Sequence, residues 1–113
     1  MKVLICGSRD WEYGGAVYKR LRDLPQGSLV ITGAARGADR LADFYARQLG
    51  HDTKRFPADW ETFGKRAGFI RNVQMLEQEP DLVIAFQKNG SRGTQHTIDE
   101  ARKRGIPVEV ISA

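Results

Sequence analysis

The sequence has 113 residues and a formal net charge of +4, with 41% hydrophobic and 28% charged residues, which is typical of an ordinary globular protein. This length favours a single domain over residues 1–113. The positive charge favours anionic partners, and apolar runs of only five or six residues, against the roughly 20 that cross a bilayer, exclude a membrane-spanning segment.

Short β-rich runs alternate with helical patterns along the chain. The first run, Lys2–Cys6, is too short for the apolar region of a signal peptide and leads directly into a turn, so we expect a cytoplasmic protein. It ends in the single cysteine, for which a buried, inert thiol is expected. Further strands are predicted at Ser28–Thr32, His51–Phe56, Asp81–Phe86 and Pro107–Ile111.

Helices are predicted where apolar residues recur at helical spacing and a glycine or proline ends the pattern. These segments are Tyr13–Leu24, Ala38–Gly50, Arg66–Gln78 and Thr94–Arg104. Within 66–78 the apolar residues are predicted to face the core, and Arg71 and Asn72 to lie on the opposite side or near the helix start. The segment Pro57–Lys65 has no clear periodicity and is predicted to be a loop with aromatic side chains.

Strands that alternate with helices at this spacing favour βαβ units and a parallel sheet. We therefore predict an α/β fold, a single Rossmann-like three-layer sandwich whose parallel five-stranded sheet has the order 3-2-1-4-5. In such sheets ligands bind outside the carboxyl ends of the strands, where the strand order reverses. The turns after the first, second and fourth strands should meet there.

The turn after the fourth strand is rich in glycine and hydroxyl residues and leads into a helix. Free backbone N–H groups at the positive end of a helix dipole can hold a phosphate. The alternative is that a hydroxyl side chain only caps the helix and that the glycines serve the turn. The residues concerned are Gly90, Ser91, Arg92, Gly93 and Thr94.

The turns after the first and second strands also combine glycine with arginine. Three arginines directed at one crevice would repel each other unless an anion lay between them, and the arginine fork matches phosphate geometry. Taken singly, each arginine would more commonly be a solvated surface residue. The candidate ligand-binding residues here are Gly7, Ser8, Arg9, Gly33, Arg36 and Gly37, together with Arg71 and Asn72 from the third helix.

Asp39 has two interpretations, a cap in the first turn of its helix or a contact to ribose hydroxyls. Trp11, Trp60 and Phe63 are candidates for stacking on a base, with core packing as the alternative. The two histidines lack metal-ligand spacing with the cysteine or the carboxylates, so no metal site is expected. No cofactor is expected either.

Four motifs in order span nearly the whole chain, and together they resemble the YspA/YpsA-related (DUF2493-like) branch of the SLOG superfamily. That superfamily also includes the cytokinin-activating phosphoribohydrolases and the Rossmann core of the DNA-processing protein DprA. The resemblance implies a Rossmann-like fold that binds nucleotides or nucleotide-derived ligands, and a dimer. The motifs are Gly7-Ser8-Arg9, Gly33-x-Ala35-Arg36-Gly37-Ala38-Asp39, Gly68-x-x-Arg71-Asn72-x-x-Met75 and Gly90-Ser91-Arg92-Gly93-Thr94.

The phosphoribohydrolase relatives carry the pattern Pro-Gly-Gly-x-Gly-Thr-x-Glu-Glu, in which the glutamates serve cleavage of a base from ribose phosphate. This sequence keeps the phosphate-binding glycines and threonine of that pattern, but His96 and Thr97 replace the glutamates. The resemblance thus implies the binding half of that chemistry and leaves the reaction open.

Three functions follow as hypotheses. The first is a sensor or binding protein for a nucleotide-like small molecule such as a nucleoside monophosphate, an ADP-ribose derivative or a cyclic nucleotide. The second is an N-glycosidic hydrolase of the phosphoribohydrolase type. The third is a single-stranded DNA-binding module, which the DprA-like motifs favour but for which a compact chain of charge +4 offers little room.

Overall fold

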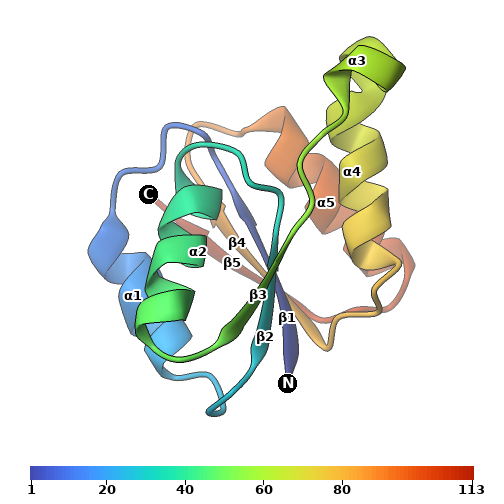
Figure 1. Ribbon diagram of the computed structural model, residues 1–113. Helices are drawn as coiled ribbons and strands as arrows, with labels where there is room; N and C mark the ends of the chain where they lie inside the picture. Colours follow the sequence, from blue (N-terminus) through green and yellow to red (C-terminus); the bar gives the residue numbers. More distant parts are fainter.

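The computed structural model describes residues 1–113 and has the three-layer α/β architecture expected from the sequence (Figure 1). The strands are β1 (Lys2–Gly7), β2 (Leu29–Thr32), β3 (Asp52–Arg55), β4 (Leu82–Gln87) and β5 (Val108–Ser112). The helices are α1 (Gly14–Arg22), α2 (Ala38–Gln48), α3 (Trp60–Phe63), α4 (Ala67–Leu76) and α5 (Arg92–Lys103), with a 3-10 turn η1 (Gly64–Arg66) between α3 and α4.

The sheet is parallel throughout and has the order β3-β2-β1-β4-β5, which confirms the predicted topology. β1 is the central strand, and its Val3 pairs with Val30 of β2 on one side and with Leu82 of β4 on the other. Because all strands run in one direction, their carboxyl ends lie along one edge of the sheet, toward the top of Figure 1.

Helices cover both faces of the sheet, with α1 and α2 on one side and α4 and α5 on the other (Figure 1). The alternation of side chains along β1 divides its apolar residues between two cores. Val3 and Ile5 pack with the α1–α2 layer, whereas Leu4 and Cys6 pack with the α4–α5 layer. This double covering explains why the strand is an unbroken apolar run rather than an alternating one.

Two local predictions are wrong. The expected loop 57–65 contains the short helix α3, whose first turn is capped because Asp59 Oδ1 accepts a hydrogen bond from the Thr62 N–H at 3.1 Å. Four residues are too few to show a helical period, so only the Asp59 cap could have indicated this helix. Arg71 and Asn72, expected away from the core, are buried in the middle of α4.

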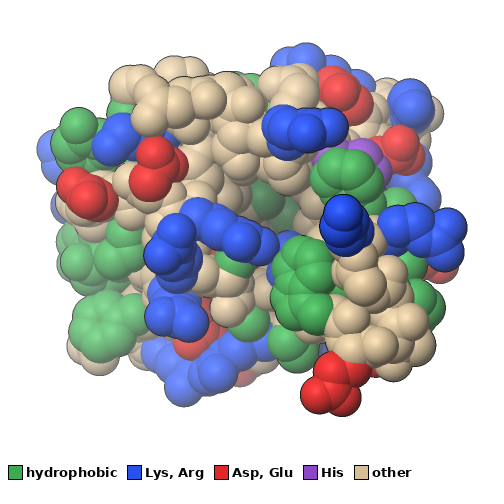
Figure 2. Space-filling view, turned by 90° about the horizontal axis from the view of Figure 1, so that it is seen from above, with side chains coloured by type: hydrophobic (Ala, Val, Ile, Leu, Met, Phe, Trp, Pro, Cys, Tyr) green, Lys and Arg blue, Asp and Glu red, His purple; other side chains and the backbone are tan.

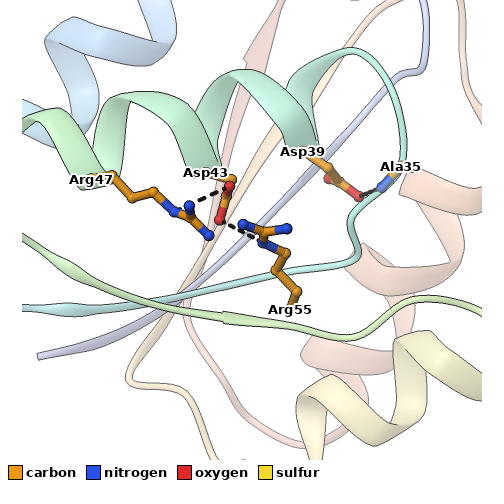
Figure 3. A network of polar contacts seen from close by, with 5 residues as sticks. All are labelled: Ala35, Asp39, Asp43, Arg47 and Arg55. Atoms are coloured by element: carbon orange, nitrogen blue, oxygen red, sulfur yellow. Dashed lines mark hydrogen bonds and ion pairs between the residues drawn. The ribbon is translucent and has the colours of Figure 1, made fainter.

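The outer edge of the sheet at β3 is polar and largely exposed. There Arg55 pairs with Asp43 of α2 at 3.2 Å, and Arg47 pairs with the same carboxylate at 3.4 Å (Figure 3). These contacts tie the edge strand to the helix that covers it. None of the helices combines the length and the apolar character that crossing a membrane requires.

Candidate functional site

A cleft of about 560 Å³ opens at the carboxyl ends of the central strands. Its wall is formed by the turns after β1, β2 and β4, by the segment from α3 to α4, and by the start of α5. Figure 2 looks down on this edge and shows a hollow near the middle of the face, bordered by Lys and Arg side chains and by hydrophobic ones. The hollow lies where the strand order reverses about β1, the usual ligand position in such sheets.

Arg71 projects from α4 into the polar floor of the cleft and is 9% exposed. Its Nη1 donates to the carbonyl oxygens of Gly33 and Phe56, the residues that follow β2 and β3. Its Nη2 has no hydrogen-bond partner within the protein. The guanidinium therefore fixes the ends of two strands and keeps one donor group for another partner.

Asn72, the next residue of α4, joins Arg71 to the start of α5. Its Oδ1 accepts from Arg71 Nε at 3.0 Å, and its Nδ2 donates to the Gly93 carbonyl at 3.3 Å. The same amide lies 3.3 Å from His96 Nδ1. Asn72 therefore holds the buried arginine and the first turn of α5 in a fixed relation.

Asp39, in the first turn of α2, is a buried carboxyl on the cleft wall. Its Oδ2 accepts from the Ala35 N–H at 3.2 Å (Figure 3), while its Oδ1 has no hydrogen-bond partner. Burial raises the pKa of Asp39 from 3.8 to about 6, although the nearby Arg71 charge and the backbone N–H groups act in the opposite direction. Asp39 therefore closes the turn before α2, rather than capping the helix N-terminus directly, and its pKa is about 6.

Gly33 lies where Asp39 and Arg71 approach each other. A Cβ at this position would lie 2.5 Å from Arg71 Nη1 and 2.9 Å from Asp39 Oδ2, so only glycine leaves room for both groups. Asp39 and Arg71 nevertheless form no direct ion pair. Burial lowers the pKa of the Arg71 guanidinium, and the Asp39 carboxylate opposes this change.

The first turn of α5 faces the same cleft through Ser91, Gly93 and Thr94. Ser91 is the N-cap residue, but its side chain makes no capping bond to the helix and instead accepts from Thr94 Oγ1 at 3.1 Å. The first turn contains no acidic residue. The free N–H groups and the dipole of α5 are thus available to an anion in the cleft.

Cationic side chains surround this opening. Arg9 and Arg36 come from the turns after β1 and β2, while Lys65 and Lys88 come from η1 and the end of β4. These four side chains come from different elements around one hollow. The wall also carries the carboxyl groups of Asp10 and Asp39, but basic side chains outnumber acidic ones there.

The structure brings most of the predicted residues together. Those on the cleft wall are Gly7, Arg9, Arg36, Asp39, Arg71, Asn72, Ser91, Gly93 and Thr94.

The remaining predicted residues lie off the wall and have other contacts. Ser8 is buried, and its Oγ bonds both the N–H and the carbonyl of Lys88, which ties the turns after β1 and β4 together. Gly37 has φ +79° and packs against the Ser8 and Arg9 carbonyl oxygens, where a Cβ would collide. Gly90 and Arg92 are exposed and are not part of the wall, and Gly33 borders an adjacent hollow.

Several wall residues were not among the predicted contacts. Among them are Cys6, Lys65, Phe69, Lys88, Asn89 and Thr97. Lys88 directly follows β4, so the rule that found the arginines after strand ends could have found it. Phe69 could not be found in this way, because an aromatic residue on a helix is more commonly part of the core.

Comparison with known proteins identifies related sequences and a related fold. The sequence model of the family described as the YspA, cpYpsA-related SLOG family (YAcAr) matches residues 1–63. The gene 61 protein of Mycobacterium phage D29 is 43% identical over 116 residues, covering 95% of this chain and 93% of the phage protein. The X-ray structure of DNA processing protein A (DprA) from Streptococcus pneumoniae superposes with a TM-score of 0.83 at 22% identity, covering 99% of this chain but 50% of that one.

Proposed function

The chain belongs to the YspA, cpYpsA-related SLOG family, and from this premise we propose that it binds a nucleotide or nucleotide-derived small molecule in the cleft. Membership of this family supports a nucleotide-related role in general. A cytoplasmic location and a dimer remain predictions.

The proposal is carried by the convergence of three features on one hollow. The acid-free first turn of α5, the uncommitted Nη2 of Arg71 and the cationic rim all face one hollow, whose volume of about 560 Å³ is in the range of small-molecule sites. In this arrangement the phosphate lies at the N-terminus of α5, held by backbone N–H groups and by the hydroxyls of Ser91 and Thr94. Arg36 and Arg71 neutralise its charge.

The proposal is tested by isothermal titration with AMP, GMP, CMP, UMP and ADP-ribose. We expect at least one of them to bind, and we expect Arg36→Ala to weaken that binding by about 1.5–3 kcal/mol, the value of a charge-assisted hydrogen bond. Arg92→Ala is the matched control, because Arg92 is an exposed arginine at the start of α5 that lies off the cleft wall. Absence of binding across the panel, or a loss confined to Arg92→Ala, would contradict the proposed site.

A hydrolytic function is the second candidate, and Asp39 is the observation that favours it. A carboxyl with a pKa of about 6 on the cleft wall can exchange protons near neutral pH, and it comes from α2 rather than from the α5 positions where the phosphoribohydrolase pattern has glutamates. Chromatography of the same nucleotide incubations tests this function. Release of free base that Asp39→Asn abolishes would establish it, and intact nucleotides after prolonged incubation would reject it.

A further inference from the structure

Trp60 presents its ring at the mouth of the cleft. It is the first residue of α3, it is 50% exposed, and it belongs to the wall of the cleft and of the adjacent hollow. The guanidinium carbon of Arg9 lies 6.0 Å from the ring centroid, at the limit of a cation–π contact. A tryptophan that remains half exposed beside a positively charged hollow has a free aromatic surface there.

Three other aromatic residues offer the cleft less free ring surface than Trp60 does. Phe63, also on α3, is 39% exposed but is not part of the cleft wall. Phe69 lies on the wall, but one face of its ring already stacks on His96 with centroids 4.2 Å apart. Trp11 is 3% exposed and packs against Phe86 in the core.

The two sides of the cleft therefore suit different chemical groups. The floor and the α5 side offer N–H groups, hydroxyls and guanidinium groups, which suit a phosphate. The α3 side offers a flat aromatic ring beside an arginine, which suits the face of a nucleobase. A sugar phosphate without a base would use only the first of these two sides.

We propose that Trp60 is the base-stacking residue of this site and makes the protein select nucleotides over base-free sugar phosphates. This inference rests on the proposed function, because it requires a phosphate-bearing ligand in the cleft. The base stacks on the face of the Trp60 ring that the Arg9 guanidinium does not cover. Every base has a π face, so the selection is for a base in general rather than for one base.

The test compares ribose 5-phosphate with AMP, GMP, CMP and UMP on the full chain, with tryptophan fluorescence and isothermal titration as readouts. Trp11 is buried, so quenching on ligand addition reports Trp60. We expect the best-bound nucleotide to bind about 5–150-fold more tightly than ribose 5-phosphate and to quench the fluorescence.

Three variants distinguish a loss of base stacking from a loss of folded structure. We expect Trp60→Ala to remove the preference for a nucleotide while leaving the affinity for ribose 5-phosphate unchanged, and Trp60→Phe to retain part of the preference. Phe63→Ala is the matched control on the same helix and should retain all of it. Circular dichroism should be the same for all three variants, because both positions are exposed.

The outcomes distinguish the two proposals. Equal affinity for ribose 5-phosphate and the nucleotides in the unaltered protein, or a preference that survives Trp60→Ala, would overturn the stacking inference and leave the phosphate site intact. Failure of every compound to bind would overturn the proposed function as well.

Discussion

Asp39 shows how a single residue can be unfavourable for folding and suited to a site. Burying a carboxylate that has an enclosed oxygen without a hydrogen-bond partner costs free energy. This loss of hydration disfavours the charged form and raises the pKa of Asp39. The nearby Arg71 guanidinium reduces the penalty but does not remove it. A structural cap would have no need of such a position, since an exposed aspartate can cap a turn equally well.

The pH dependence of stability follows from the sign of this shift. The pKa of Asp39 is about 6 in the folded protein, against 3.8 without the fold, so between these values the folded chain binds more protons than the unfolded one. The free energy of unfolding should therefore fall as the pH rises from about 4 to 6, by up to about 3 kcal/mol from this residue. We expect the difference in unfolding free energy between Asp39→Asn and the unaltered protein to grow in favour of the variant over this interval. Urea titrations at pH 4, 5, 6 and 7 measure it, and parallel pH profiles would contradict the assignment.

At the scale of elements, α4 and α5 are joined by polar contacts near the site as well as by apolar packing. Asn72 alone connects Arg71, the Gly93 carbonyl and His96, and it is 5% exposed. Removing it would leave the buried Arg71 Nε without its acceptor, whereas the Gly93 carbonyl would keep its bond from Thr97 Oγ1.

We accordingly expect Asn72→Ala to lower the free energy of unfolding by about 1–3 kcal/mol. The same variant should weaken nucleotide binding, because the first turn of α5 loses its fixed position relative to Arg71. Gln74→Ala, at an exposed position of the same helix, should change neither property. Urea unfolding and isothermal titration of both variants provide the measurement; equal stability of the two would show that the Asn72 contacts contribute nothing net.

The elements could largely be predicted from the sequence, because the long helices carry a hydrophobic period and end near glycine or proline, and the central strands are continuous apolar runs. Two residues were placed wrongly because of the same reasoning from hydrophobic periodicity. Arg71 and Asn72 are polar residues on a helix, and periodicity assigns polar residues to the solvent side. Their partners, such as the Gly33 and Phe56 carbonyls, are distant in sequence, so nothing local could indicate that they are buried.

The candidate site was predictable to the extent that its residues follow strand ends. Arg9 and Arg36 were found in this way, because the carboxyl ends of parallel strands share one edge. Which side of a turn faces the cleft depends on the path of the backbone in three dimensions, and for that reason Arg92 was expected in the site although it lies off its wall.

For the whole molecule, the distribution of charge matters more than its sum. The basic side chains of the proposed site line a single hollow. With a net charge of +4, few further basic residues are in excess that could contact a nucleic-acid strand over many phosphates. Proteins that contact many phosphates lose affinity steeply as salt rises.

We expect binding of the best mononucleotide to weaken only modestly between 50 and 200 mM KCl, whereas a strand-binding protein with 6–10 phosphate contacts would lose about 10³–10⁵-fold. Fluorescence anisotropy of a labelled single-stranded oligonucleotide, with the mononucleotide as competitor, is the comparison to make. Tight oligonucleotide binding with a steep salt dependence, not displaced by the mononucleotide, would favour the DNA-binding function instead.

The central position of β1 also affects how the chain is made. β1 ends at residue 7, but β4, its partner on one side, begins only at residue 82. At translation rates of about 5–20 residues per second, the ribosome needs roughly 4–15 s to pass from one to the other. Throughout that interval the apolar strand β1 of the nascent chain has an unpaired edge on the side of β4, so neither the complete sheet nor the cleft at its carboxyl end can form until β4 and α5 have been synthesised.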